Sequence, residues 1–428
     1  MTTFRPAPPS APRSEHLSHS ADTPPAIEHV HAAHAHGHGE LPLAPEQRRR
    51  VRTVLAAIVI PLLLLTIVGL VALWPRGESP VASIPLLADG MSIETARVVN
   101  LGDPAAGVEV RAELLTGSRP GQVINVHVPE EVRANGLEEG SRIQLVFAPE
   151  AIGSEHSAFV FWDFERSSPM LWLAAIYLLA VLIVARWRGL AAVAGLLASL
   201  GIVVVFMLPA LMAGHSPPLV ALVGASAMMF IAVYLAHGVS VRTTTALLGT
   251  FVGLAATTAL AAWGTQAAGL NGAYSDTSRM LWGTFPNLNL QQLLLCGILV
   301  AGLGALNDVT ITQASAVWEL HAADPRMPKR KLFSRGMRIG RDHIASTVYT
   351  LTFAYVGTAL PVLLLTAAMD RSFLSTLGAG EIAEEVVRTL VSSTGLVLAI
   401  PVTTFIAVTL VSSTRPETAR RVPAPAQR

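Results

Sequence analysis

Long apolar runs recur along the chain, and they constrain its fold more than any other feature. The first covers residues 54–74, and seven more follow at 170–184, 190–211, 219–236, 244–264, 290–311, 344–368 and 388–411. A helix of about 20 apolar residues spans the roughly 30 Å hydrocarbon layer of a bilayer. Charged residues make up only 14% of the chain, whereas soluble domains carry about 25%. The pattern therefore predicts an α-helical polytopic membrane protein with about eight transmembrane helices.

Residues 76–168 have a different pattern, which predicts a small folded domain outside the membrane. Short segments in which apolar residues alternate with polar ones occur at 93–99, 108–114, 123–128, 142–147 and 158–164. Turn-forming sequences such as Gly102-Asp103-Pro104 separate them. Alternation with a period of two, broken by turns, is typical of strands. We expect a small β domain here, with an OB-like barrel as its specific topology.

The two ends of the chain lack apolar periodicity. Residues 1–50 are rich in Pro, Ala, Ser and His, and such a segment buries too little surface to offset the entropy of ordering. We expect a disordered cytoplasmic tail, then the first transmembrane helix at 51–75. The apolar run in that helix is longer than the 7–15 residues of a signal peptide, which favours an uncleaved anchor. The β domain, a seven-helix transmembrane domain at 169–412 and a cytoplasmic tail at 413–428 complete the predicted organisation.

Basic residues concentrate in alternate connections between the apolar runs. They occur at 48–52, 186–188, 242, 326–341 and 415–421, whereas the other connections are mainly acidic. Connections rich in Lys and Arg remain in the cytoplasm. Both termini are therefore predicted to be cytoplasmic and the β domain extracytoplasmic, which agrees with an even number of spans.

Polar residues on two consecutive apolar segments are the first candidates for function. A carboxylate within a membrane helix is costly and is a functional hypothesis by default, while imidazole suits proton transfer because its pKa is near 6.5. We expect two facing stripes that form an ion-coupling seam. The stripes consist of Asn307, Asp308 and Thr312 on one helix and Asp342, His343 and Ser346 on the next. The alternative is that Asp308 lies at the interface, where it caps its helix or pairs with a loop arginine, and that Asp342 and His343 cap theirs.

A second candidate is an extracytoplasmic acidic cluster at the start of the last apolar helix. Glu381, Glu384 and Glu385 recur at helical spacing ahead of Arg388. They either collect a cation at the mouth of a pathway or form a solvated helical turn in which one glutamate pairs with Arg388. The second interpretation is the favoured one.

The amino-terminal tail contains a histidine tract. Its residues are His29, His31, His34, His36 and His38. Such tracts bind transition metals weakly, so these are weak candidates for a metal site. Compositional bias in a disordered tail is the favoured interpretation.

Several classes of function lack support in the sequence. The chain has no nucleophile elbow, P-loop, dinucleotide-binding fingerprint or zinc-protease helix, so we expect neither an enzyme nor a bound cofactor. The single cysteine, Cys296, excludes an intrachain disulfide. No basic face is interleaved with aromatic residues, which argues against a nucleic-acid partner.

Three sequence blocks, 304–313, 336–344 and 381–390, together resemble the YibE/F family of bacterial multispan membrane proteins. The resemblance extends over about residues 90–412 and implies a location in the bacterial cytoplasmic membrane. It implies no catalytic role, because the family has no established biochemical activity. A fainter similarity links Leu306-Asn307-Asp308 and the basic segment after it to proton-driven export proteins of the SecD/SecF kind, as an analogy.

Two functional hypotheses follow. The first is a transporter or export-associated membrane protein that uses the polar seam for coupling to an ion, with a small molecule or ion as its unidentified substrate. The second is a non-transporting membrane scaffold whose β domain binds an envelope partner. Beyond the lipid bilayer, the expected partners are an envelope protein or a second copy of the chain. The substitution Asp308→Asn separates the hypotheses, because only the first requires a charge at this position.

Overall fold

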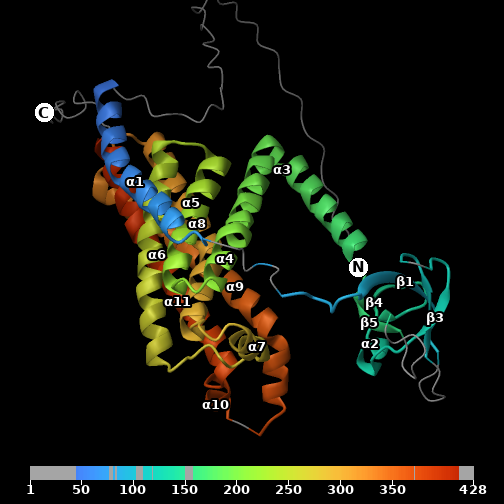
Figure 1. The fold of residues 1–428 in the computed structure, drawn as a ribbon. Coiled ribbons are helices and arrows are strands. Elements are labelled where there is room, and N and C mark those ends of the chain that lie inside the picture. Colours follow the sequence, from blue (N-terminus) through green and yellow to red (C-terminus); the bar gives the residue numbers. More distant parts are fainter. Residues whose placement is uncertain are drawn as a thin grey trace, which may run out of the picture. The chain divides into compact units, whose positions relative to one another are not determined.

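A computed structural model of the chain describes residues 45–76, 81, 84–102, 109–117, 119–149, 158–370 and 372–413 (Figure 1). The predicted disorder of the first 44 residues, the histidine tract and the carboxy-terminal tail lie outside the described residues. The described part consists mainly of long apolar helices, with one curled antiparallel sheet. Seven of its helices are long and apolar enough to cross a bilayer. The chain is thus a multi-pass membrane protein.

The long helices coincide with the apolar runs of the sequence. They are α1 (Pro45–Ala72), α3 (Ser167–Ile202), α5 (Pro217–His237), α6 (Val241–Ala267), α8 (Leu290–Ala323), α9 (Lys329–Ala367) and α11 (Gly380–Ser413). A π-helical turn, η2 (Val203–Met207), and α4 (Leu208–Met212) continue α3. Two short helices, α7 (Asp276–Thr284) and α10 (Phe373–Leu377), lie in the connections.

Helix α3 is broken at Arg186. This residue has φ 55° and ψ −141°, and it is the only non-glycine residue with positive φ in the described ranges. Figure 1 accordingly draws α3 as two arms. The arms coincide with the predicted spans 170–184 and 190–211. The count of eight spans stays a prediction, because it requires each arm to cross the bilayer separately.

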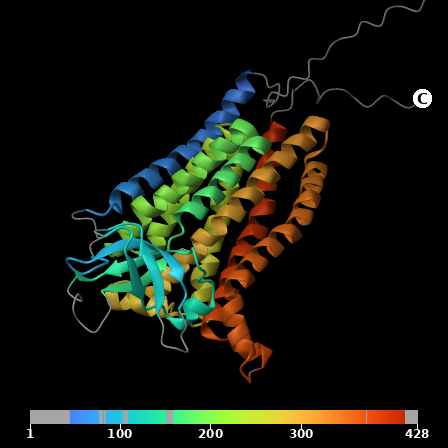
Figure 2. The same cartoon turned by 90° about the vertical axis from the view of Figure 1, so that its right-hand side faces the viewer.

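Helices α6, α8 and α11 pack together at the centre of the helical part, and Figure 2 shows α8 in orange beside α11 in red. Small residues at four-residue spacing line the contact between α6 and α11. Added Cβ atoms at Gly249 and Gly395 would overlap the hydroxyl oxygens of Thr403 and Thr257, respectively. At Gly253 a Cβ would lie 3.0 Å from that of Ala399. Because these residues are small, the backbones of α6 and α11 approach each other closely. The resulting van der Waals contact drives helix association in lipid.

The β domain is a five-stranded antiparallel sheet in the order β3-β2-β1-β4-β5, and its strands lie in the segments where the alternation predicted them. Its strands are β1 (Ser92–Asn100), β2 (Val110–Leu114), β3 (Val123–Val126), β4 (Arg142–Phe147) and β5 (Phe159–Phe164). A short helix, α2 (Glu130–Ala134), connects β3 to β4. An isolated parallel bridge between His127 and Val160 brings the two edges together, so the sheet curls around an apolar core.

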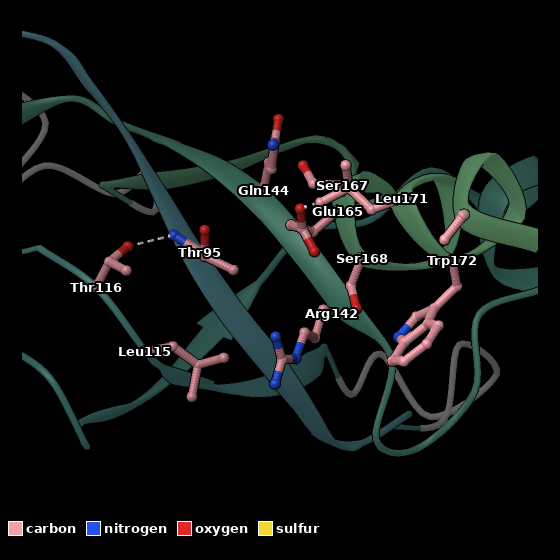
Figure 3. A pocket seen from close by; sticks show the side chains of 11 residues that line it. Thr95, Leu115, Thr116, Arg142, Gln144, Glu165, Ser167, Ser168, Leu171 and Trp172 are labelled. Atoms are coloured by element: carbon pink, nitrogen blue, oxygen red, sulfur yellow. Dashed lines mark hydrogen bonds between the residues drawn. The ribbon is translucent and has the colours of Figure 1, made fainter. Parts of the chain in front are cut away.

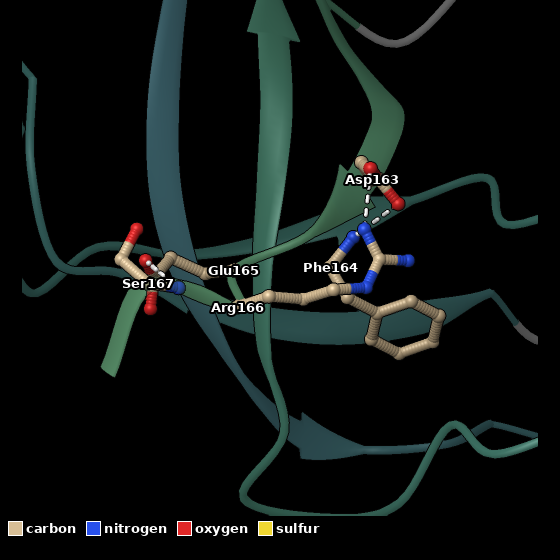
Figure 4. A network of polar contacts seen from close by, with 5 residues as sticks. All are labelled: Asp163, Phe164, Glu165, Arg166 and Ser167. Atoms are coloured by element: carbon tan, nitrogen blue, oxygen red, sulfur yellow. Dashed lines mark hydrogen bonds and ion pairs between the residues drawn. The ribbon is translucent and has the colours of Figure 1, made fainter. Parts of the chain in front are cut away.

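A local polar network marks the passage from β5 to α3 (Figure 4). The Arg166 guanidinium donates a hydrogen bond of 2.6 Å to Oδ2 of Asp163 and lies 5.7 Å from the ring centre of Phe164. This hydrogen bond holds the pKa of Asp163 below its ordinary value and raises that of Arg166. The Ser167 amide donates to Glu165, and hydrogen bonding by Ser167 lowers the pKa of that carboxyl.

Candidate functional site

Asp308 on α8 and His343 on α9 approach each other. Nε2 of His343 lies 3.9 Å from Oδ2 of Asp308, and the side chains are 33% and 70% exposed, respectively. Helices α8 and α9 are neighbours joined by the short connection 324–328. The structure therefore brings together two of the titratable residues that the sequence singled out, one from each predicted stripe. They form an ion pair when the imidazole is protonated.

The other predicted seam residues do not all join this pair. Asn307 is half-buried, and its Oδ1 has no hydrogen-bond partner among the described residues. Thr312 is also half-buried, whereas Asp342 and Ser346 are exposed. Thr347, the neighbour of Ser346, is buried and donates its hydroxyl to the His343 carbonyl. The contact region is therefore narrower than a continuous seam of six residues.

Glycines decide how closely the neighbouring helices approach. Gly304 lies one turn before Asp308 on α8, and a Cβ added there would meet nothing within 4 Å. A close approach is found instead at Gly302, where a Cβ would lie 3.2 Å from Oγ of Ser392 on α11. The closely packed face of α8 therefore contains Gly302, because α8 packs more extensively on α11 than on α9.

Gln313 is a buried polar residue that sequence analysis did not select. Its side chain is on α8, and Nε2 donates to the Gly336 carbonyl of α9 at 2.9 Å and to Oγ1 of Thr404 on α11 at 2.7 Å. Gln313 is only 3% exposed. Gly340 brings α9 close to this point, since a Cβ there would lie 3.0 Å from the Gln313 amide oxygen. The four-residue spacing of Gly336 and Gly340 was the available sequence signal.

His237 lies near Asp308 and was not among the residues selected from the sequence. It is at the end of α5, within electrostatic range of Asp308 and of Arg242. Three helices thus contribute titratable groups to this region. In the described part of the chain, no group of three or more His, Cys, Asp or Glu residues is arranged to hold a metal ion.

The predicted acidic cluster lines a cavity of about 430 Å³. Residues from four helices contribute to its wall, among them Glu381, Glu384, Glu385, Arg388, Gly297, Thr358 and Ser278. Nε of Arg388 lies 3.4 Å from Oε2 of Glu385, with side chains 21% and 31% exposed. Oε1 of Glu384 is buried without a hydrogen-bond partner among the described residues. The turn includes the Arg388 pairing that we favoured, but its carboxylates are half-buried instead of solvated.

Leu351 of α9 and Leu396 of α11 belong to an apolar cluster and lie along their helices between the cavity and the Asp308–His343 pair. The cluster also includes Val309, which follows Asp308 on α8, and Ile400, which packs against Gly340. Along α8, Gly297 at the cavity and Asp308 are about 16 Å apart, by the rise of about 1.5 Å per residue. Leu351 lies about midway between His343 and Thr358 on α9. Two aliphatic side chains, those of Leu351 and Leu396, therefore lie between the two polar regions.

Another hollow, at the end of the sheet, contains none of the predicted site residues (Figure 3). Its wall includes Arg142, Gln144 and Glu165, together with the first turn of α3. Oγ1 of Thr116 accepts a 2.7 Å hydrogen bond from the Thr95 amide at its edge. The side chains there do not form a recognisable catalytic arrangement.

Comparison with known protein families gives a match to the helical part of the chain. A family model described as YibE/F-like protein matches residues 173–413, which include the helices from α3 to α11. The sheet, to which we extended the resemblance, lies outside the matched residues. No curated protein and no solved structure matches the chain.

Proposed function

For this chain, which belongs to the YibE/F-like family, we propose a role as a transporter that moves a solute or ion between α8, α9 and α11. Asp308 and His343 couple this movement to protons. The observation that carries the proposal is the 3.9 Å approach of these two side chains from separate apolar helices. A carboxylate in such a helix costs about 2.5–3.5 kcal/mol on insertion scales. A protonated imidazole nearby offsets part of that cost, and histidine side chains commonly serve as proton carriers.

The arrangement around the pair supports a closed pathway. The cavity with Arg388 and the glutamates is one polar compartment, and the Asp308–His343 pair is the other. Aliphatic side chains of Leu351 and Leu396 separate them. Hydrophobic constrictions close membrane pathways by excluding water. In this proposal, movement of α9 relative to α11 opens the barrier and connects the compartments.

We further propose that both arms of α3 cross the bilayer, which gives eight spans and two cytoplasmic termini in a bacterial cytoplasmic membrane. The distribution of basic residues among the connections supports this orientation. We also infer that the β domain is an extracytoplasmic OB-type barrel. Its strand order, its parallel bridge and the helix between β3 and β4 support that topology.

One observation favours the scaffold as a second candidate function. The strands expose large apolar side chains, including Val123 at 52%, Val160 at 53% and Trp162 at 45%. Exposed apolar clusters are common at protein-interaction sites. In this alternative the sheet binds an envelope partner, and the helices serve as its anchor.

The barrier provides a test that does not require knowledge of the substrate. The full chain is reconstituted in liposomes that contain a pH-sensitive dye, and a potassium diffusion potential drives proton entry. Leu396→Ala, at a position that is 1% exposed, should open the barrier and increase acidification at least about tenfold over wild type. Adding Asp308→Asn should return the rate to the wild-type level. Leu390→Ala is the matched control, because Leu390 is on the same helix and is 61% exposed.

Two results would argue against transport. If Leu396→Ala liposomes stay as tight as wild type, the apolar cluster is not a barrier. If they leak equally with and without Asp308, the pair does not conduct protons. Either outcome would favour the scaffold.

A further inference from the structure

The first turns of α9 have two sharply different faces. Gly336 and Gly340 are buried against Thr404 and Ile400 of α11. At about 3.6 residues per turn, the opposite half of the helix contains only exposed positions. Five of these are basic: Arg330, Lys331, Arg335, Arg338 and Arg341. The packing of the glycines thus fixes which way the cationic face points.

These five cations have no ion pair with any carboxylate in the described part of the chain. Arginines elsewhere do pair, for example Arg388 with Glu385. Like charges at i, i+3 and i, i+4, such as Arg335 and Arg338, repel each other and destabilise a helix. One carboxylate, Asp342, is exposed on the same face, so the five cations leave an excess of positive charge that is complementary to an anionic ligand.

The same helical face becomes apolar about two turns after Arg341. Arg335 and Phe353 are separated by five full turns, and Arg338 and Tyr349 by about three, so each pair projects in nearly the same direction. Tyr349, Phe353, Leu360 and Leu364 are 62%, 69%, 60% and 73% exposed. The rings of Tyr349 and Phe353 lie with centroids 6.3 Å apart. A ligand that covers this whole face needs an anionic head and a long apolar body.

We propose that the outer face of α9 binds an anionic phospholipid. Arg335, Arg338 and Arg341 contact its phosphate headgroup, and its acyl chains lie along the stripe from Tyr349 to Leu364. Each basic residue next to a membrane helix contributes about 1 kcal/mol to the binding of anionic lipid, which is roughly a fivefold increase in affinity. A soluble anion or an acidic protein would not use the apolar continuation. The site is independent of the proposed transport path, since none of these side chains lines the cavity.

The test uses the full chain, delipidated in detergent and mixed with equal amounts of phosphatidylglycerol and phosphatidylcholine that have identical acyl chains. Native mass spectrometry counts the lipids that remain bound. We expect at least about tenfold preference for phosphatidylglycerol in the wild type. The triple variant Arg335→Gln/Arg338→Gln/Arg341→Gln should lose that preference. Glycerol 3-phosphate at the same concentration should not displace the lipid.

Two controls separate site binding from general charge. Replacing Arg97, Arg111 and Arg119 of the sheet domain by glutamine removes the same charge from exposed positions, and should leave the preference unchanged. A triple lysine variant at the α9 positions preserves the charge that guides insertion, and should retain most of the preference. Equal binding of the two lipids by the wild type would overturn the proposal. So would an unchanged preference in the glutamine variant on α9, or displacement by glycerol 3-phosphate.

Discussion

The contact between α6 and α11 predicts that identical substitutions will have opposite effects at different glycines. At Gly395 of α11, an added Cβ would overlap the Thr257 hydroxyl and would lie 3.1 Å from Cβ and 3.5 Å from Cα of that residue. Rotation of the threonine side chain moves its hydroxyl away but leaves Cβ in place, and a distance of 3.1 Å to Cβ is still too short for an unstrained contact. The substitution Gly395→Ala should therefore push the two helices apart.

The magnitude follows from two opposing effects. Overpacking a filled core costs typically 1–3 kcal/mol, whereas alanine is favoured over glycine in a helix by about 1 kcal/mol. The net change for Gly395→Ala is a loss of about 0–2 kcal/mol. At Gly357 of α9, nothing lies within 4 Å of an added Cβ. Gly357→Ala should therefore stabilise the protein by about 1 kcal/mol through helix propensity alone.

Adding Gly249→Ala tests whether the interface behaves as one rigid unit. An added Cβ at Gly249 would overlap Thr403, about 12 Å along the axis from the Gly395 contact. Independent sites at that distance would show additive losses. We expect less than additivity, because one displacement of α11 relieves both overlaps.

The natural thiol provides the assay. Cys296 is the only cysteine of the chain and is 4% exposed on α8, so a thiol-reactive fluorogenic dye reports unfolding during a thermal scan in detergent. A change of 1 kcal/mol corresponds to roughly 2–4 °C for domains of 150–250 residues. Gly395→Ala should lower the midpoint by up to about 8 °C, and Gly357→Ala should raise it. If both variants shift the midpoint upward by similar amounts, the close helix approach is incorrect.

Three further predictions concern topology and the separate parts of the chain. Reporter fusions after Arg188 should be cytoplasmic and those after Gly214 extracytoplasmic, and a single inversion contradicts the eight-span arrangement. The sheet domain, residues 82–166, should be soluble alone with a strand-rich circular dichroism spectrum. The hydrogen bond from Arg166 lowers the pKa of Asp163 in the folded domain. The ionised carboxyl therefore stabilises the fold fully above about pH 4, and this stabilisation is lost as the pH falls further. An acid transition unchanged by Asp163→Asn would contradict this. Deletion of residues 1–44 should leave membrane insertion intact, because the arginine cluster at 48–52 remains. Loss of insertion would show that the tail is needed for it.

The sequence alone determined the membrane class, the positions of the long helices and the strands of the small sheet. These properties depend on whether a run of neighbouring residues is more stable in lipid, in a protein core or in water. The composition of the run and the spacing of its apolar residues are enough to predict this. The approach of Asp308 and His343 was also predictable, because a short connection forces α8 and α9 to be neighbours. Their spacing from the turn then sets them at similar depth.

Only the tertiary structure decided which faces of the helices meet. The distribution of apolar residues around a helix says little about its buried face in lipid, since both the outside and the inside of the bundle are apolar. The sequence therefore could not distinguish Gly302, which packs on Ser392, from Gly304, which packs on nothing within 4 Å. It could not identify the partners of Gln313 either, because Gly336 and Thr404 lie on two other helices. Those contacts depend on the rotation of each helix about its axis, which is fixed only when all the neighbouring helices pack together.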